Sequence, residues 1–187
     1  MAKITYAPAV KHMHGHLGKM VFKERMGQDI VAEKPDQVNQ PNSPAQMAQR
    51  QNFRDAAAYG KGAMQDAQAH AAYAAKAKVL HSSPMAVAIQ DWMNEPAVTA
   101  IDLSHYNKHV GDVISITAVD DFAVTGVTVV IKDNAQAVVE SSAAVFDTTS
   151  GSWKYTATVD ASAKPSVTAT ATASDRPGNT GVLSATK

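Results

Sequence analysis

Three histidines near the N-terminus have a spacing that suits a metal site. His12, His14 and His16 alternate with other residues, so in an extended segment their imidazoles lie on one face, about 6–7 Å apart. Zinc, nickel and copper ions bind imidazole, and subunits could share such an ion. No nearby carboxylate completes the ligand set, and Gly15 makes the segment flexible. We therefore favour histidines that are solvated or hydrogen-bonded in an interface.

Three aspartates of the C-terminal half fall in predicted loops. Asp120, Asp121 and Asp175 could gather at one end of a sandwich, where a calcium ion would find some of the roughly six to eight oxygens that it takes. Aspartate is also a common turn former, whose carboxylate caps the neighbouring backbone. The turn-forming role is favoured, and we predict no metal or other cofactor.

The remaining polar residues do not form an enzyme motif. The other four histidines are dispersed along the chain: His70, His81, His105 and His109. The sequence has no Gly-x-Ser-x-Gly elbow, no His-Glu-x-x-His helix, no phosphate-binding glycine-rich loop and no dinucleotide fingerprint. We therefore predict that the protein is not an enzyme.

Four aromatic residues could stack on sugar rings: Trp92, Tyr106, Trp153 and Tyr155. Trp153 and Tyr155 share the face of a predicted strand with Ala157 and Val159, and this is the face expected to be buried. Core packing is therefore the favoured role, and a carbohydrate-binding module is kept as an alternative.

The composition excludes several classes of function. The 187 residues carry no formal net charge and no cysteine, which removes the electrostatic case for nucleic-acid binding and excludes disulfides and thiolate metal sites. No apolar run approaches the roughly 20 residues that span a bilayer, and the first residues lack the apolar region of a Sec signal peptide. We expect no nucleic-acid partner and no membrane span. The localisation stays open, with an extracellular assembly or a virion favoured.

The C-terminal half has the two-residue period of β-strands. Ile114 and Ile116 alternate with polar residues, and the alternation recurs over 153–159 and 167–173. It places one set of side chains in a core and the other in water. Turn residues separate seven such runs, at about 97–104, 112–119, 124–132, 136–146, 152–159, 166–174 and 179–186. Seven short strands with this spacing predict a sandwich of two antiparallel sheets.

Four stretches of this half resemble bacterial immunoglobulin-like modules of surface and secreted proteins: 114–121, 124–131, 153–158 and 171–179. The Ala-x-Asp-x-Pro-Gly-Asn ending, Ala173 to Asn179, is the most specific of them. The resemblance covers about 96–187, and the antibody-type cysteine pair is absent. It implies an immunoglobulin-like β-sandwich that serves as a spacer, an adhesin or an assembly unit. Residues 17–95 resemble only uncharacterised bacterial proteins, which implies no function.

The N-terminal half predicts a hairpin followed by helices. Residues 19–25 and 29–34 flank a glycine-containing loop, which is typical of a β-hairpin. Ser43 and Pro44, with Gln46 completing a capping box, predict the start of a helix that runs to about residue 59.

Further helices are predicted before the sandwich. Gly60 and Gly62 count against an unbroken continuation of the first helix. The alanine-rich segment 63–80 is expected to be helical, and Ser83 with Pro84 opens a third helix that ends near residue 94.

The N-terminal half lacks the large apolar side chains of an independent core. Residues 1–18 form an apolar tail expected to be irregular, because Pro8, Gly15 and Gly18 prevent a regular helix. The tail and arm must therefore complete their burial elsewhere, on their own sandwich or on a neighbouring copy. The expected assembly contacts are Ile4, Tyr6, Val10, Met13, Leu17, Val21, Phe22, Ile30, Val31 and Phe53.

These observations predict an α+β chain in three parts. An irregular tail (1–18) precedes a hairpin and helical arm (19–95), and a seven-stranded immunoglobulin-like sandwich follows (96–187). The favoured function is a non-enzymatic structural subunit that assembles with copies of itself into an extracellular filament or tube. The alternatives are a virion or phage-like particle protein and a monomeric adhesin or carbohydrate-binding module.

Overall fold

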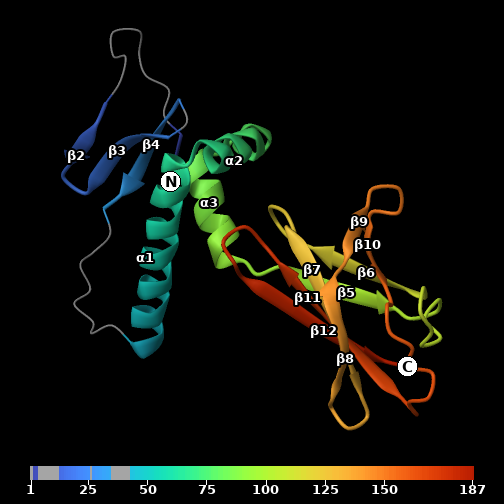
Figure 1. Ribbon diagram of the computed structural model, residues 1–187. Helices are drawn as coiled ribbons and strands as arrows, with labels where there is room; N and C mark the ends of the chain where they lie inside the picture. The colour runs from blue at the N-terminus through green and yellow to red at the C-terminus, as the bar shows by residue number, and fades with distance from the viewer. Residues whose placement is uncertain (1, 4–12, 26, 35–42) are drawn as a thin grey trace. The chain divides into compact units, whose positions relative to one another are not determined.

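The computed structural model describes residues 2–3, 13–25, 27–34 and 43–187 (Figure 1). Within them the chain has an α+β fold of three helices and three four-stranded antiparallel sheets. The chain divides into two compact units, residues 1–43 and 44–187, which we call the N-terminal unit and the C-terminal unit. This division differs from the boundary expected at residue 96, because the helices belong to the same unit as the sandwich.

The N-terminal unit is a small sheet with the strand order β1-β4-β3-β2. Its strands are β1 (Ala2–Lys3), β2 (Gly15–Leu17), β3 (Met20–Arg25) and β4 (Gln28–Glu33). The predicted hairpin is confirmed as β3 and β4, which pair from Met20–Glu33 to Arg25–Gln28. The tail differs from the expected irregular segment, because β1 and β2 extend the sheet. Gly18 supplies the positive φ of 59° for the turn into β3.

The three helices are α1 (Pro44–Gln65), α2 (Ala67–Leu80) and α3 (Pro84–Met93). The predicted start of the third helix at Ser83 and Pro84 is confirmed, and Ser83 caps it, since its Oγ accepts a hydrogen bond of 3.2 Å from the Ala86 amide. Helix α1 continues through both glycines to Gln65, beyond the end expected near residue 59. The break comes at Asp66, whose carboxylate caps α2 by accepting from the Ala69 amide at 2.6 Å.

The helices share a small core of their own within the C-terminal unit. Tyr73 is fully buried among Ala63, Ala69, Ala77, Val87 and Ala88. Phe122 from the β6–β7 loop of the sandwich completes this core, with its ring 4.5 Å from that of Tyr73. The helices thus bury part of their surface on their own sandwich, through Phe122.

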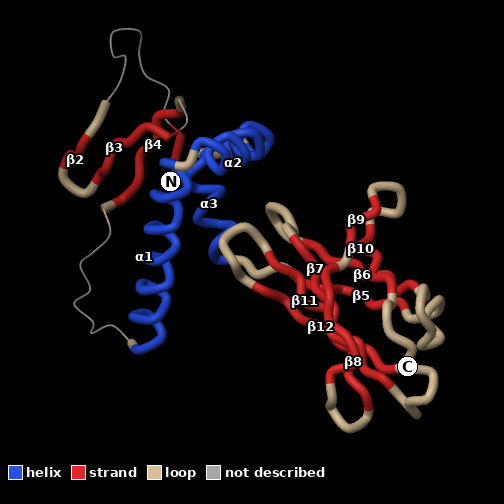
Figure 2. Tube along the Cα trace, viewed as in Figure 1, coloured by secondary structure: helices blue, strands red, loops and turns tan. Residues whose placement is uncertain are grey.

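The sandwich consists of two four-stranded sheets (Figure 2). One has the order β5-β6-β10-β9 and the other the order β12-β11-β7-β8. The strands are β5 (Ala97–Asp102), β6 (Val113–Val119), β7 (Gly126–Asp133), β8 (Val138–Ala143), β9 (Val145–Asp147), β10 (Ser152–Thr156), β11 (Val167–Ser174) and β12 (Thr180–Thr186). The run expected as one strand over 136–146 is two strands, because the chain crosses between the sheets at Ala144.

The sandwich core follows the predicted alternation. Every second residue of β11 is buried, from Val167 to Ala173, and Ile114 and Ile116 of β6 are fully buried. Burying a large aliphatic side chain stabilises a fold by about 1.5–3 kcal/mol. Across the helices of the described part, no segment combines the length and the apolar character that a membrane crossing needs.

Candidate functional site

The predicted assembly residues that the structure describes form an apolar face on the N-terminal sheet. Leu17 lies opposite Met20, and Phe22 lies opposite Val31. Directly opposed residues share a face, as do residues two apart in a strand, so all four belong to one face. Leu17 is 63% exposed and Met20 is 47% exposed. Phe22 and Val31 of this face are half-buried, as are Val21 and Ile30, which occupy the other face.

No described side chain between residues 13 and 34 is buried. The first turns of α1 also have no buried side chain. Residues 43–55 are all exposed, and the buried face of the helix begins only at Ala56. Phe53 is 51% exposed and Met47 is 55% exposed. Met13 lies among the exposed residues too, whereas Ile4, Tyr6 and Val10 lie outside the described residues. The described arm therefore presents exposed apolar side chains, both on the N-terminal sheet and, separately, in the first turns of α1.

The histidine pattern is only partly described. His12 lies outside the described residues, and His14 and His16 are exposed. His16 belongs to β2, where it pairs with Val21. The trio as a metal site is therefore not tested by the structure.

The aromatic residues considered for sugar binding are engaged in packing. Tyr106 and Tyr155 are buried in the sandwich core, where neither can stack on a ligand. Trp153 is partly buried against that core and lies 5.2 Å from Phe146, ring to ring. Trp92 packs at the same ring distance of 5.2 Å on Tyr59. The core-packing role is confirmed for the two tyrosines.

Two of the three loop aspartates converge with an aspartate that the sequence analysis did not single out. Asp91, Asp120 and Asp175 each bring one carboxylate oxygen into a group whose members lie within 4.8 Å of one another. We call these three residues the acidic cluster. Asp91 comes from α3, Asp120 from the β6–β7 loop and Asp175 from the β11–β12 loop. Asp121 lies close enough for its charge to act on Asp91.

Asp91 has an unusual electrostatic environment for a carboxylate. Burial, opposed by a hydrogen bond from Tyr73 and reinforced by the charges of Asp120, Asp175 and Asp121, raises the pKa of Asp91 to about 6. Burial also raises the pKa of Tyr73. The Tyr73 hydroxyl therefore stays protonated and donates a hydrogen bond to Asp91 Oδ2. Tyr59 then donates to the Tyr73 hydroxyl at 2.7 Å, since Tyr73 has no second proton.

The predicted turn-forming role of Asp120 and Asp175 is confirmed. Asp120 Oδ2 accepts hydrogen bonds from the amides of Phe122 at 3.0 Å and Ala123 at 2.7 Å. Asp175 Oδ1 accepts from the amides of Gly178 and Asn179, both at 2.7 Å. The two loops are thus shaped by carboxylates that also meet in the acidic cluster.

Asn179 joins the β11–β12 loop to the end of α3. Its side-chain amide lies 2.8 Å from Asp175 Oδ2 and 3.1 Å from the Trp92 carbonyl, which belongs to the last turn of the helix. The last carbonyls of a helix have no partner within it, so Asn179 satisfies groups that the helix leaves open. This contact holds Asp91 beside the loop aspartates.

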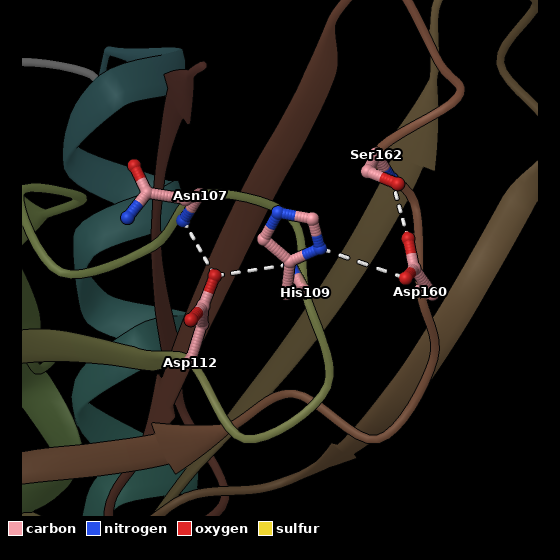
Figure 3. Close-up of polar contacts among 5 residues, drawn as sticks. All are labelled: Asn107, His109, Asp112, Asp160 and Ser162. Atoms are coloured by element: carbon pink, nitrogen blue, oxygen red, sulfur yellow. Dashed lines mark hydrogen bonds and ion pairs between the residues drawn. The ribbon is translucent and has the colours of Figure 1, made fainter.

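A contrasting pair of aspartates lies at the start of β6 and beyond β10 (Figure 3). Asp112 accepts from the amides of Asn107 at 2.6 Å and His109 at 3.0 Å, and these bonds hold the pKa of Asp112 below its usual range. Asp160 accepts from the Ser162 amide at 2.8 Å and lies 3.6 Å from His109 Nδ1. Ser162, with His109, lowers the pKa of Asp160. These carboxylates are ordinary turn formers on an exposed surface.

No family model matches the chain, and no curated protein matches it. Among solved structures, the chain is similar to a crystal structure described as a tetra-tandem repeat in the extending region of a large adhesion protein. The two share 26% identity with a TM-score of 0.37, over 50% of this chain and 23% of that chain. This chain therefore matches less than a quarter of the length of that chain.

Proposed function

We propose that the protein is a non-enzymatic structural subunit that assembles with copies of itself through its N-terminal unit. The observation that carries this proposal is one apolar face of the N-terminal sheet, on which Leu17 and Met20 are exposed and Phe22 and Val31 are half-buried. A sheet that is apolar on one face buries that face against another element. Within the described residues no other element fully covers this face, so in this proposal it packs against a second copy of the chain.

The exposed beginning of α1 supports the same proposal. Residues 44–55 are helical and wholly exposed. Most helices in proteins are stabilised by the packing of one face, and in α1 only the part from Ala56 onward has buried residues. Phe53 and Met47 give this segment apolar side chains for a partner to cover. The surface donated to a neighbour then comprises the N-terminal sheet and the first turns of α1.

The receiving surface that we propose is the sheet edge formed by β9. This strand is short and lies at the edge of its sheet. Val145 is 73% exposed and Phe146 is 48% exposed there. Edge strands have unpaired backbone groups that accept a further strand. Because the donating and receiving surfaces are different, each copy can bind one neighbour through each surface. Such head-to-tail contacts build a filament, unless the rotation between successive copies closes a ring.

The test is deletion of residues 1–34, combined with a pair of point variants. We expect the deletion variant to stay folded and monomeric while the full chain forms filaments or other oligomers in electron micrographs. Phe22→Gln removes a large side chain from the apolar face, whereas Lys23→Gln changes the opposite face of the same strand. The first should weaken association by about 10-fold or more, which corresponds to about 1.4 kcal/mol, and the second should leave it unchanged.

Two alternative functions give different outcomes in the same experiment. A virion or phage-like particle protein would give closed particles instead of open filaments. If the protein is a monomeric adhesin or carbohydrate-binding module, the full chain would be monomeric, and deleting residues 1–34 would not change its oligomeric state. The burial of Tyr106 and Tyr155 favours the structural subunit over a sugar-binding module.

A further inference from the structure

We infer that the protein binds a calcium ion between the end of α3 and one end of the sandwich, with Asp91, Asp120 and Asp175 as carboxylate ligands. This inference does not depend on self-assembly, because all three ligands belong to the C-terminal unit. It begins with the convergence of three carboxylate oxygens within 4.8 Å of one another.

Asp91 provides the observation that points to a ligand. The residue is 0% exposed, and only one of its oxygens is used, because Oδ2 accepts from Tyr73. Its other oxygen, Oδ1, is buried and accepts no hydrogen bond. A buried carboxylate oxygen without a partner is costly, and native proteins almost always satisfy such groups. A cation beside Asp91 Oδ1 would satisfy it.

In Asp120 and Asp121, as in Asp91, one carboxylate oxygen accepts a hydrogen bond and the other does not. Asp120 uses Oδ2 to cap its loop, and its Oδ1 is buried without a hydrogen-bond partner. Asp121 accepts from the Asn94 side chain at 2.7 Å through Oδ2, and its Oδ1 is likewise buried without a partner. In Asp91, Asp120 and Asp121 the fold therefore uses one carboxylate oxygen for structure and leaves the other available to an ion. Asp175 has both oxygens hydrogen-bonded, to the amides of Gly178 and Asn179 and to the Asn179 side chain, so it would share an oxygen that already accepts a hydrogen bond.

Among the described residues, no ion pair neutralises the acidic cluster, although Arg176 is close enough for its charge to act on Tyr59 together with those of Asp91 and Asp175. Asp91, Asp120, Asp121 and Asp175 are all anionic when ionised, and the charges of the other three act on Asp91. The ion pairs of the described residues lie elsewhere, at Lys164–Asp133 and His109–Asp160. Buried charges are paired or coordinate metals in native proteins. A divalent cation is the group that would balance this site.

Calcium fits the ligand chemistry better than other metals. The ligands are all oxygens, which favours a hard cation over zinc or copper. Calcium accepts irregular coordination at about 2.3–2.6 Å, so two of its ligands lie at most about 4.6–5.2 Å apart. The three oxygens of the cluster lie within 4.8 Å of one another, which is compatible with this limit. Magnesium requires near-octahedral geometry, dehydrates reluctantly and is usually held by one or two carboxylates, so a site with three carboxylates suits calcium better.

The ion would link α3 to the sandwich and stabilise their packing against each other. Its ligands come from α3 and from two loops that connect sandwich strands. Ring packing between Tyr73 and Phe122, at 4.5 Å, and the contact of Asn179 with the Trp92 carbonyl, at 3.1 Å, cross the same junction. Bound calcium would therefore act on the stability of the whole C-terminal unit.

The experiment is a calcium titration of the full chain after treatment with a chelator, with calcium chloride alone as the probe. Calorimetry should give one ion per chain. Calcium at about 100-fold above its Kd should raise Tm by about 5–10 °C for a chain of this size. Asp91→Asn and Asp120→Asn keep the hydrogen-bond acceptors and lose the charge, and each should weaken calcium binding by about 10-fold or more.

Asp112→Asn is the matched control, because Asp112 also accepts two backbone amides but lies at the other end of β6 (Figure 3). It should bind calcium like the wild type. Three results would overturn the inference: a wild-type chain whose Tm and heat signal do not respond to calcium, an equal response to magnesium, or a loss of binding in Asp112→Asn as large as in Asp120→Asn. The wild-type titration decides the question even if a variant fails to fold.

Discussion

At the scale of single residues, the sequence predicted the local role of the aspartates but not their convergence. Asp120 and Asp175 shape their loops as expected. Asp91 was missed because a charged residue in a helix is usually solvated. One signal could have identified it: Val87 and Ala88, four and three residues earlier, are buried, and residues at these spacings share a helix face. An aspartate on the buried face of a helix needs a partner, and Tyr73 satisfies only one of its oxygens.

The ion pair between Lys164 and Asp133 makes stability depend on pH. Asp133 is 5% exposed, and the Lys164 ammonium at 2.8 Å holds the pKa of Asp133 below its usual range. Because the pKa of Asp133 is lower in the folded state than in the unfolded state, the ion pair stabilises the fold at pH values above the unfolded-state pKa of about 4. This stabilisation is lost as the pH falls through the folded pKa. We expect Lys164→Met to lower Tm at pH 7 and to reduce the fall in Tm on acidification.

Thermal unfolding followed by circular dichroism between neutral and strongly acidic pH measures this difference. Lys154→Met is the control, because Lys154 donates to Ser115 at 2.8 Å and forms no ion pair among the described residues. The charge of Lys154 makes only a minor contribution to lowering the pKa of Asp102 and Asp147, so Lys154→Met should change the acid dependence of Tm less than Lys164→Met does. A wild type and a Lys164→Met variant with parallel Tm curves over the whole pH range would contradict the role given to this pair.

At the scale of elements, periodicity predicted the strands well because each strand buries alternate residues. It failed at 136–146, where the chain leaves one sheet for the other at Ala144 and apolar residues continue on both sides. The glycines of α1 were also misleading. Gly60 is buried against α3, where an added Cβ would lie 2.9 Å from Met85 Sδ. Its smallness serves helix packing, and propensity alone does not reveal this.

Two glycines should respond in opposite ways to the same substitution. Gly62 is exposed within α1 and an added Cβ meets nothing within 4 Å, so Gly62→Ala should stabilise the fold by up to about 1 kcal/mol through helix propensity. At Gly181 an added Cβ would lie 1.8 Å from the Pro96 carbonyl oxygen. Gly181→Ala should destabilise by about 1–3 kcal/mol or more.

Denaturant unfolding of the two alanine variants provides the measurement. If Gly181→Ala unfolds at the wild-type denaturant concentration, the close approach of β12 to the start of β5 is wrong. If Gly62→Ala is strongly destabilised, the continuity of α1 through this position is wrong instead.

At the scale of the whole molecule, the helices and the sandwich form one unit that the sequence divided at residue 96. The reason is that Phe122, a loop residue of the sandwich, is part of the helical core. A single apolar residue between two aspartates and an alanine gives no periodic signal, so the sequence could not show where it packs. The shortage of large apolar residues before residue 96 was a better guide, because it predicted that these helices need an additional surface.

The central claim is that the apolar face of the N-terminal sheet docks on another copy, and the mass of the full chain in solution tests it most directly. Light scattering and sedimentation over a range of concentrations should give a mass that rises above the 19.7 kDa of one chain. The fragment 44–187, which lacks the N-terminal unit, should stay monomeric over the same range. A full chain that keeps a mass of 19.7 kDa at the highest concentration would contradict the claim.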